Sequence, residues 1–109
     1  MKMIIAIVHD DDGHKVMHGL NANGFTVTKL ATTGGFLKAG NTTLLIGVEK
    51  EEVDNVIEII EKISTSRTEV VTSPTPTAGI TGVYMPFPIE VQVGGATIFV
   101  MDVERFEKV

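Results

Sequence analysis

The segment that most constrains this fold is residues 49–64, EKEEVDNVIEIIEKIS, which has the period of an amphipathic helix. The apolar residues on its single apolar face are Val53, Val56, Ile57, Ile60 and Ile63. Acidic residues crowd the first turn and Lys62 lies near the end, as the helix dipole favours. A helix with one apolar face has to pack on another apolar layer, so we expect a sheet beside it.

Short strand-like runs flank this helix and can supply that layer. Residues 3–8, MIIAIV, form a continuous apolar, β-branched run that is typical of a buried strand. Residues 25–31 begin with the alternating apolar and polar residues that are typical of a strand, and residues 42–48 are predicted to form another strand. A second helix is predicted over residues 11–22, because acids stand at its start and Asn23-Gly24 is a stop signal.

The last third of the chain differs in character. All four prolines lie within residues 65–88, so we predict a long loop there, and such loops in small domains tend to be functional or mobile. The following run, EVQVGGATIFVMDV, predicts a hairpin that turns at Gly94-Gly95. The element order is therefore βαββαβ with an extra hairpin strand. It predicts an α+β, ferredoxin-like sandwich in one domain, residues 1–109. The helices would leave one face of the sheet open, which favours an oligomer.

Composition excludes several classes of protein. With a formal net charge of −5 and no run of Lys and Arg, the chain lacks the basic surface of a general nucleic-acid binder. No apolar run approaches the roughly 18 residues that span a membrane, and the start lacks the pattern of a signal peptide. We therefore expect a cytoplasmic protein that has neither nucleic acid nor a membrane as a partner.

The sequence has no pattern of a catalytic site. It contains no Cys, and its serines fall at the end of the predicted helix and in the predicted loop. A GxxxxGK[ST] phosphate-binding loop is missing as well. We therefore expect a protein that is not an enzyme and that carries no cofactor.

The stretch ATTGGFLKAGN, residues 31–41, has the residue types of a ligand-binding loop. Gly34-Gly35 can adopt positive φ and bring backbone N–H groups close to a phosphate. Phe36 can stack on a base, and the amide of Asn41 can pair with the edge of an adenine. A plain hairpin, in which Gly-Gly only reverses the chain, explains the same residues. The pattern alone leaves both explanations open.

A pair of histidines offers a different chemistry. His14 and His18 are four residues apart on the predicted second helix, a spacing that can hold a transition metal. No third ligand is fixed by the sequence, so a solvated helix start is the simpler explanation. We therefore assign no metal site.

Several long motifs resemble one known family. They are MKMIIAIV, FTVTKLATTGGFLKAGNTT, TSPTPTAG and YMPFPIEVQVGGATIFVMDV. Together they cover essentially the whole chain, which is similar to the PII-like cyclic-di-AMP receptor proteins. The resemblance implies a PII-like, ferredoxin-like domain that forms a homotrimer. It also implies a receptor without enzymatic activity that binds the second messenger cyclic-di-AMP in clefts between subunits, with loop rearrangement that passes the signal to a downstream protein.

The resemblance also implies a set of ligand-binding residues. Carried onto this chain, they are Thr28, Gly35, Phe36, Leu37, Asn41 and Gly47. The chemistry of these residues agrees with that assignment. The backbone at Gly35 and Leu37 can supply N–H donors, and a glycine at position 47 lets a base approach the strand closely.

The chain departs from the family pattern at two places. Relatives often carry Arg where this chain has Thr26, and they usually end with Gln where this chain ends RFEKV. Three other functions remain as alternatives. They are a PII-like sensor of another adenine nucleotide, a non-catalytic trimeric scaffold and a metal-binding module.

Overall fold

The computed structural model describes residues 1–30, 40–73 and 87–109. Its helices and strands are β1 (Lys2–His9), α1 (Asp10–Ala22), β2 (Val27–Leu30), β3 (Asn41–Val48), α2 (Val53–Ser64), β4 (Arg67–Ser73), β5 (Phe87–Val93) and β6 (Ala96–Asp102). A short 3-10 helix, η1 (Lys50–Glu52), precedes α2. The helix predicted from residue 49 is therefore confirmed, except that its first turn is 3-10 rather than α.

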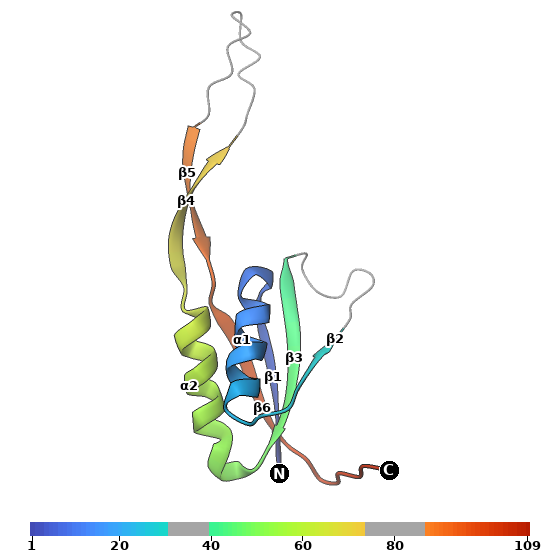
Figure 1. Ribbon diagram of the computed structural model, residues 1–109. Coiled ribbons are helices and arrows are strands. Elements are labelled where there is room, and N and C mark those ends of the chain that lie inside the picture. The colour runs from blue at the N-terminus through green and yellow to red at the C-terminus, as the bar shows by residue number, and fades with distance from the viewer. Residues whose placement is uncertain (31–39, 74–86) are drawn as a thin grey trace, which may run out of the picture.

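The main sheet has four strands in the order β2-β3-β1-β6, and all its neighbouring strands pair antiparallel. Both helices lie on one face of this sheet (Figure 1). This is an α+β architecture that is compatible with a ferredoxin-like fold. The last strand, β6, lies beside β1 and completes the βαββαβ pattern.

The hydrophobic core lies between the main sheet and the two helices. Its fully or almost fully buried residues are Ile4, Ala6, Val8, Val16, Leu20, Leu44, Ile46, Val48, Val56 and Ile60. On β1 and β3 these are alternate residues, as expected for strands with one covered face. On α2, Val56 and Ile60 fall on the predicted apolar face, and Val53, Ile59 and Ile63 pack against the core while partly exposed. Ile57, predicted on the same face, is partly buried but is not among the residues that pack on this core, and Ile59 takes its place.

The prediction of a long loop over residues 65–88 is wrong at both of its ends. Arg67–Ser73 forms β4, which pairs antiparallel with β5, Phe87–Val93. The run RTEVVTS is rich in Thr and Val, which favour strands, and its pairing with β5 supplies the backbone hydrogen bonds it needs. The part of the predicted loop between these strands, residues 74–86, lies outside the described residues.

The predicted hairpin at Gly94-Gly95 is also wrong, because β5 and β6 belong to different sheets. β5 pairs with β4, whereas β6 occupies the edge of the main sheet beside β1. Both glycines have positive φ, +84° and +85°, and the N–H of Gly95 donates to the carbonyl of Ser64. A Cβ on Gly94 would lie 2.6 Å from the carbonyl oxygen of Thr65. The two glycines therefore carry the chain from one sheet to the other across a crowded junction.

The strands β4 and β5 form a two-stranded ribbon that extends away from the main sheet (Figure 1). Arg67, at the base of the ribbon, donates to both carboxylate oxygens of Asp12 over 2.8 and 3.3 Å. Asp12 is completely buried in the first turns of α1. The hydrogen bond to Asp12 raises the pKa of Arg67 above its ordinary value. This ion pair therefore ties the ribbon to the body of the domain.

None of the helices in the described part of the chain is long and apolar enough to cross a membrane.

Candidate functional site

The face of the main sheet that the helices do not cover carries three of the predicted ligand-binding residues. On β3, Leu44 and Ile46 point into the core, so the alternating residues Asn41, Thr43, Leu45 and Gly47 belong to the other face. Thr28 is paired with Leu45 and shares that face. We call this surface the open face. It carries Thr28, Asn41 and Gly47 on one side of the molecule.

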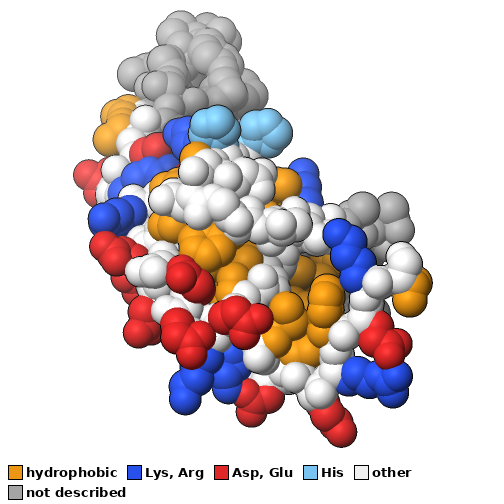
Figure 2. All heavy atoms as spheres, turned by 60° about the horizontal axis from the view of Figure 1, so that its bottom comes forward, with side chains coloured by type: hydrophobic (Ala, Val, Ile, Leu, Met, Phe, Trp, Pro, Cys, Tyr) orange, Lys and Arg blue, Asp and Glu red, His pale blue; other side chains and the backbone are white. Residues whose placement is uncertain are grey.

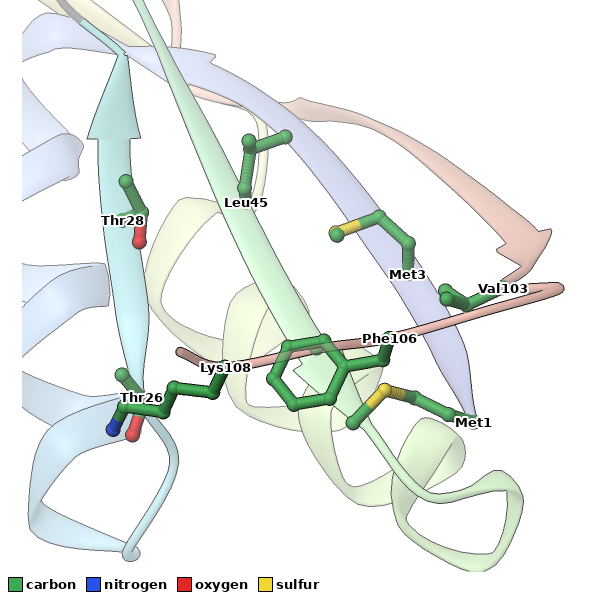
Figure 3. Close-up of a pocket in the computed structure, with 9 residues that line it drawn as sticks. Met1, Met3, Thr26, Thr28, Leu45, Val103, Phe106 and Lys108 are labelled. Atoms are coloured by element: carbon green, nitrogen blue, oxygen red, sulfur yellow. The ribbon is translucent and has the colours of Figure 1, made fainter.

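One end of the open face is hollowed into a cavity of about 360 Å³. Residues from both termini and from β1, β2 and β3 line it (Figure 3): Met1, Met3, Thr26, Thr28, Leu45, Gly47, Val103, Phe106 and Lys108. We call this the Gly47 cavity. It contains two predicted site residues, Thr28 and Gly47.

The Gly47 cavity combines apolar walls with a few polar groups. Thr28 on β2 and Thr26, which directly precedes β2, each bring a hydroxyl. Figure 3 shows Lys108 directed toward Thr26, and it is the one cationic side chain among the described residues that line the cavity. A Cβ built on Gly47 has no heavy atom within 4 Å, so a ligand can approach the strand there without displacing protein atoms. Such a mixture suits a ring-bearing ligand with few charges.

The sequence patterns did not predict that the C-terminal tail forms part of this cavity. The N–H of Val103 donates to the carbonyl of Met1 over 3.2 Å, which directs the tail across the end of the sheet. Phe106 and Lys108 then lie over strands that are distant in sequence (Figure 3). The sequence offers two signals, one aromatic residue within a charged tail and the departure of RFEKV from the usual ending of relatives, and neither indicates what Phe106 contacts.

Asn41 lies at the opposite end of the open face from Gly47. It is the first residue of β3, and six residues of strand place it about 20 Å from Gly47. It is paired with His9 of β1 and lines a separate hollow of about 260 Å³. The other residues of this hollow are Ile7, Val8, His9, Gly94, Gly95, Ala96 and Thr97. We call it the Asn41 hollow. The single chain therefore does not place Asn41 and Gly47 in the same cavity.

The rim of the Asn41 hollow is more polar than that of the Gly47 cavity. The N–H of Asp11 donates to Nδ1 of His9 over 3.3 Å, so His9 caps α1. In a neutral imidazole the other nitrogen then carries the proton and can donate to a ligand. Asn41 adds an amide with a donor and an acceptor, and Thr97 adds a hydroxyl. This end of the open face can therefore read the hydrogen-bonding edge of a base.

The remaining predicted site residues, Gly35, Phe36 and Leu37, lie outside the described residues. Their roles stay predictions.

The described part of the chain contains no group of three His, Cys, Asp or Glu residues that could hold a metal ion. His14 and His18 are both exposed on α1. Figure 2 shows two of the three histidine side chains of the chain next to each other at the surface. The same view shows hydrophobic side chains that reach the surface between acidic and basic ones.

The chain has an α+β fold with one covered sheet face and polar groups placed in hollows on the other, which is compatible with a small-molecule binding domain. Over residues 1–109, the whole chain, the sequence matches the model of the cyclic-di-AMP receptor family. The chain therefore belongs to the cyclic-di-AMP receptor family, whose members bind this second messenger in signal transduction. Membership in a receptor family indicates a binding protein.

A solved structure is similar to the chain over nearly its full length. It is the crystal structure of a functionally unknown protein from Pediococcus pentosaceus, with 44% sequence identity and a TM-score of 0.75. The match covers 99% of this chain and 96% of that chain. The fold is therefore shared with a protein of known structure that is itself functionally unknown.

Proposed function

We propose that this protein binds cyclic-di-AMP on the open face of its sheet, in clefts between copies of the chain, and signals its presence to a partner protein. The observation that carries the proposal is the shared location of Thr28, Asn41 and Gly47 on this one face. Its hydroxyls, amide and open strand backbone match a ligand with adenine rings and few accessible charges.

The proposed clefts lie between subunits because one chain separates the parts of the site. The Gly47 cavity and the Asn41 hollow lie at opposite ends of β3. Large apolar side chains on the open face support an interface there, since Phe99 and Met101 are 52% and 46% exposed in the single chain. We propose a homotrimer in which neighbouring subunits complete each cleft. Sedimentation of the purified protein measures this directly, and a monomer at every concentration would exclude it.

Binding is expected to depend only weakly on salt. The ligand brings two phosphates to a chain of net charge −5, and Lys108 is the one basic residue among the described residues that line the Gly47 cavity. Directed hydrogen bonds and stacking therefore have to provide the affinity. A plot of log affinity against log salt should have a slope of about −1 or smaller in magnitude. A steep slope, typical of many phosphate–Lys contacts, would contradict this mechanism.

Calorimetry with cyclic-di-AMP, with cyclic-di-GMP and ATP as competitors, tests the ligand. We expect one ligand per chain and little competition. Asn41→Ala should weaken binding about tenfold or more, because the base loses a bidentate partner. Asn55→Ala is the matched control, since Asn55 is an exposed amide on α2 that contacts Glu52 instead of the open face. Equal loss in both variants would show that Asn41 has no specific role.

We further propose that ligand binding changes the segment between β4 and β5, and that a partner protein reads this change. The support is the position of the ribbon, which extends from the body and is tied to α1 by the Arg67–Asp12 ion pair. Hydrogen exchange with and without cyclic-di-AMP should differ within residues 65–88. Identical protection in both states would remove this part of the proposal.

A further inference from the structure

Two adjacent threonines on β3 differ in whether their hydroxyls are paired. Thr42 is on the covered side of the sheet, and its Oγ1 donates to Oδ1 of Asp10 over 2.5 Å. Its side chain also lies against α1, where a Cβ built on Gly13 would come within 3.1 Å of the same oxygen. Thr42 therefore holds the start of α1 on the sheet, and its hydroxyl is fully explained by the fold.

Thr43 is on the open face, and its hydroxyl has no such explanation. The residue is 5% exposed, and its Oγ1 is the one buried side-chain oxygen or nitrogen in the described residues that has no hydrogen-bond partner. A buried hydroxyl without a partner lowers stability, so proteins rarely retain one without a role. A ligand with an acceptor atom at this point would supply the missing partner.

The position of Thr43 connects the two parts of the proposed site. It is two residues from Asn41 and two from Leu45, which lines the Gly47 cavity, so it lies between the two hollows on the same strand and face. Its partners across the sheet are Ile7 on β1 and Leu30 on β2. These apolar neighbours disfavour a charged phosphate at this point and favour the uncharged ring of a base.

We propose that Thr43 is a ligand-binding residue whose hydroxyl donates a hydrogen bond to a ring nitrogen of an adenine seated beside Asn41. This inference rests on the proposed cyclic-di-AMP function. The hydroxyl is unpaired and covered in the free protein, so the ligand has to displace the atoms that cover it before this hydrogen bond can form. A neutral donor next to the amide of Asn41 adds to the reading of the base edge.

The test uses three variants of the full chain: Thr43→Val, Thr43→Ser and Thr42→Val. Valine has nearly the shape of threonine without the hydroxyl. Thr43→Val should weaken cyclic-di-AMP binding about tenfold, whereas Thr43→Ser, which keeps the hydroxyl, should stay within about threefold of wild type. Without ligand, Thr43→Val should melt at the same temperature as wild type or higher, because it removes an unpaired buried polar group.

Thr42→Val gives the opposite pattern and is the control. It should melt at a lower temperature than wild type, because Asp10 loses its hydrogen bond, while the folded protein binds the ligand with nearly unchanged affinity. Wild-type affinity in Thr43→Val would overturn the inference, and so would a loss of melting temperature as large as that of Thr42→Val. Failure of the wild-type protein to bind cyclic-di-AMP would instead overturn the proposed function itself. The two failures are therefore distinguishable.

Discussion

The two faces of the main sheet differ in how completely their side chains are buried and how completely their polar groups are hydrogen-bonded. On the covered face, Leu44 and Ile46 have no exposed surface and the hydroxyl of Thr42 is paired. On the open face, Thr43 is unpaired, Gly47 faces empty space and Phe99 is half exposed. Both faces are formed by the same strands, so the difference comes from what packs on each of them.

This difference separates stability from binding within single strands. Residues that point toward the helices lose solvent contact on folding and contribute most of the hydrophobic free energy. Most of the residues that alternate with them, such as Thr28 and Gly47, keep surface or hydrogen-bonding groups that a ligand or a second subunit can use. A substitution on one face should therefore change stability, and the same change one residue away should mainly change binding.

The largest expected effect is a loss of folding stability caused by a substitution on the covered face. Leu44→Ala should lower the free energy of unfolding by about 3 kcal/mol, because it removes a fully buried side chain from the core. Leu45→Ala, one residue along β3, should cost about 1 kcal/mol, since Leu45 is only partly buried and lines the Gly47 cavity. Urea unfolding followed by circular dichroism measures both.

The ligand affinities of the same two variants complete the comparison. We expect cyclic-di-AMP to bind folded Leu44→Ala almost as tightly as wild type, and Leu45→Ala less tightly. If both variants lost equal stability and equal affinity, the two faces would not be separable in the way described.

A smaller effect, on affinity rather than stability, is expected at Gly47. A Cβ there meets no atom of the chain within 4 Å, so Gly47→Ala should change the free energy of unfolding by less than about 0.5 kcal/mol. The added methyl group occupies the space through which the ligand approaches β3, so binding should weaken about tenfold, equivalent to about 1.4 kcal/mol. Calorimetry measures the affinity and urea unfolding the stability.

Gly13→Ala is the matched control on the covered face. A Cβ at Gly13 comes within 3.1 Å of Thr42, whose hydroxyl is held by Asp10 and has little freedom to move. We expect this variant to lose stability and to keep its ligand affinity. Wild-type binding by Gly47→Ala would show that the ligand does not approach this part of the strand.

The covered face and its elements could be predicted from the sequence, because their signals are local. The period of residues 53–64 identified α2 and its buried side, and the β-branched run of residues 3–8 identified β1. In the structure, alternation along β3 places Asn41 and Gly47 on a common face. A common face does not determine distance along the strand, and the chain separates these two residues by about 20 Å.

The rest of the fold depends on pairings between distant segments, which local patterns do not reveal. The run RTEVVTS was included in the predicted loop because prolines follow it, although its partner is a strand after those prolines. Gly94-Gly95 has the local pattern of a hairpin, but β6 pairs with β1, about ninety residues away, instead of β5. For the same reason, no sequence signal placed Phe106 and Lys108 in the Gly47 cavity.

The smallest expected effect is a change in melting temperature at the end of the sheet, outside the Gly47 cavity and the Asn41 hollow. Lys2 and Asp102, which are paired across β1 and β6, form an exposed salt bridge. The hydrogen bond from Lys2 lowers the pKa of Asp102 below its ordinary value. A carboxylate whose pKa is lower in the folded state stabilises the fold above its unfolded pKa, about 3.9. That stability is lost as the pH falls through the folded value.

Asp102→Asn should therefore reduce the melting temperature slightly at neutral pH and leave it unchanged in strong acid, where the wild-type carboxyl is also protonated. High salt should shrink the difference at neutral pH, because an exposed pair is screened. Ligand affinity should not change, since Asp102 lines neither hollow. A change in affinity would show that the edge of the sheet is coupled to its open face, and the separation between stability and binding would then hold only for the residues at the centre of the strands.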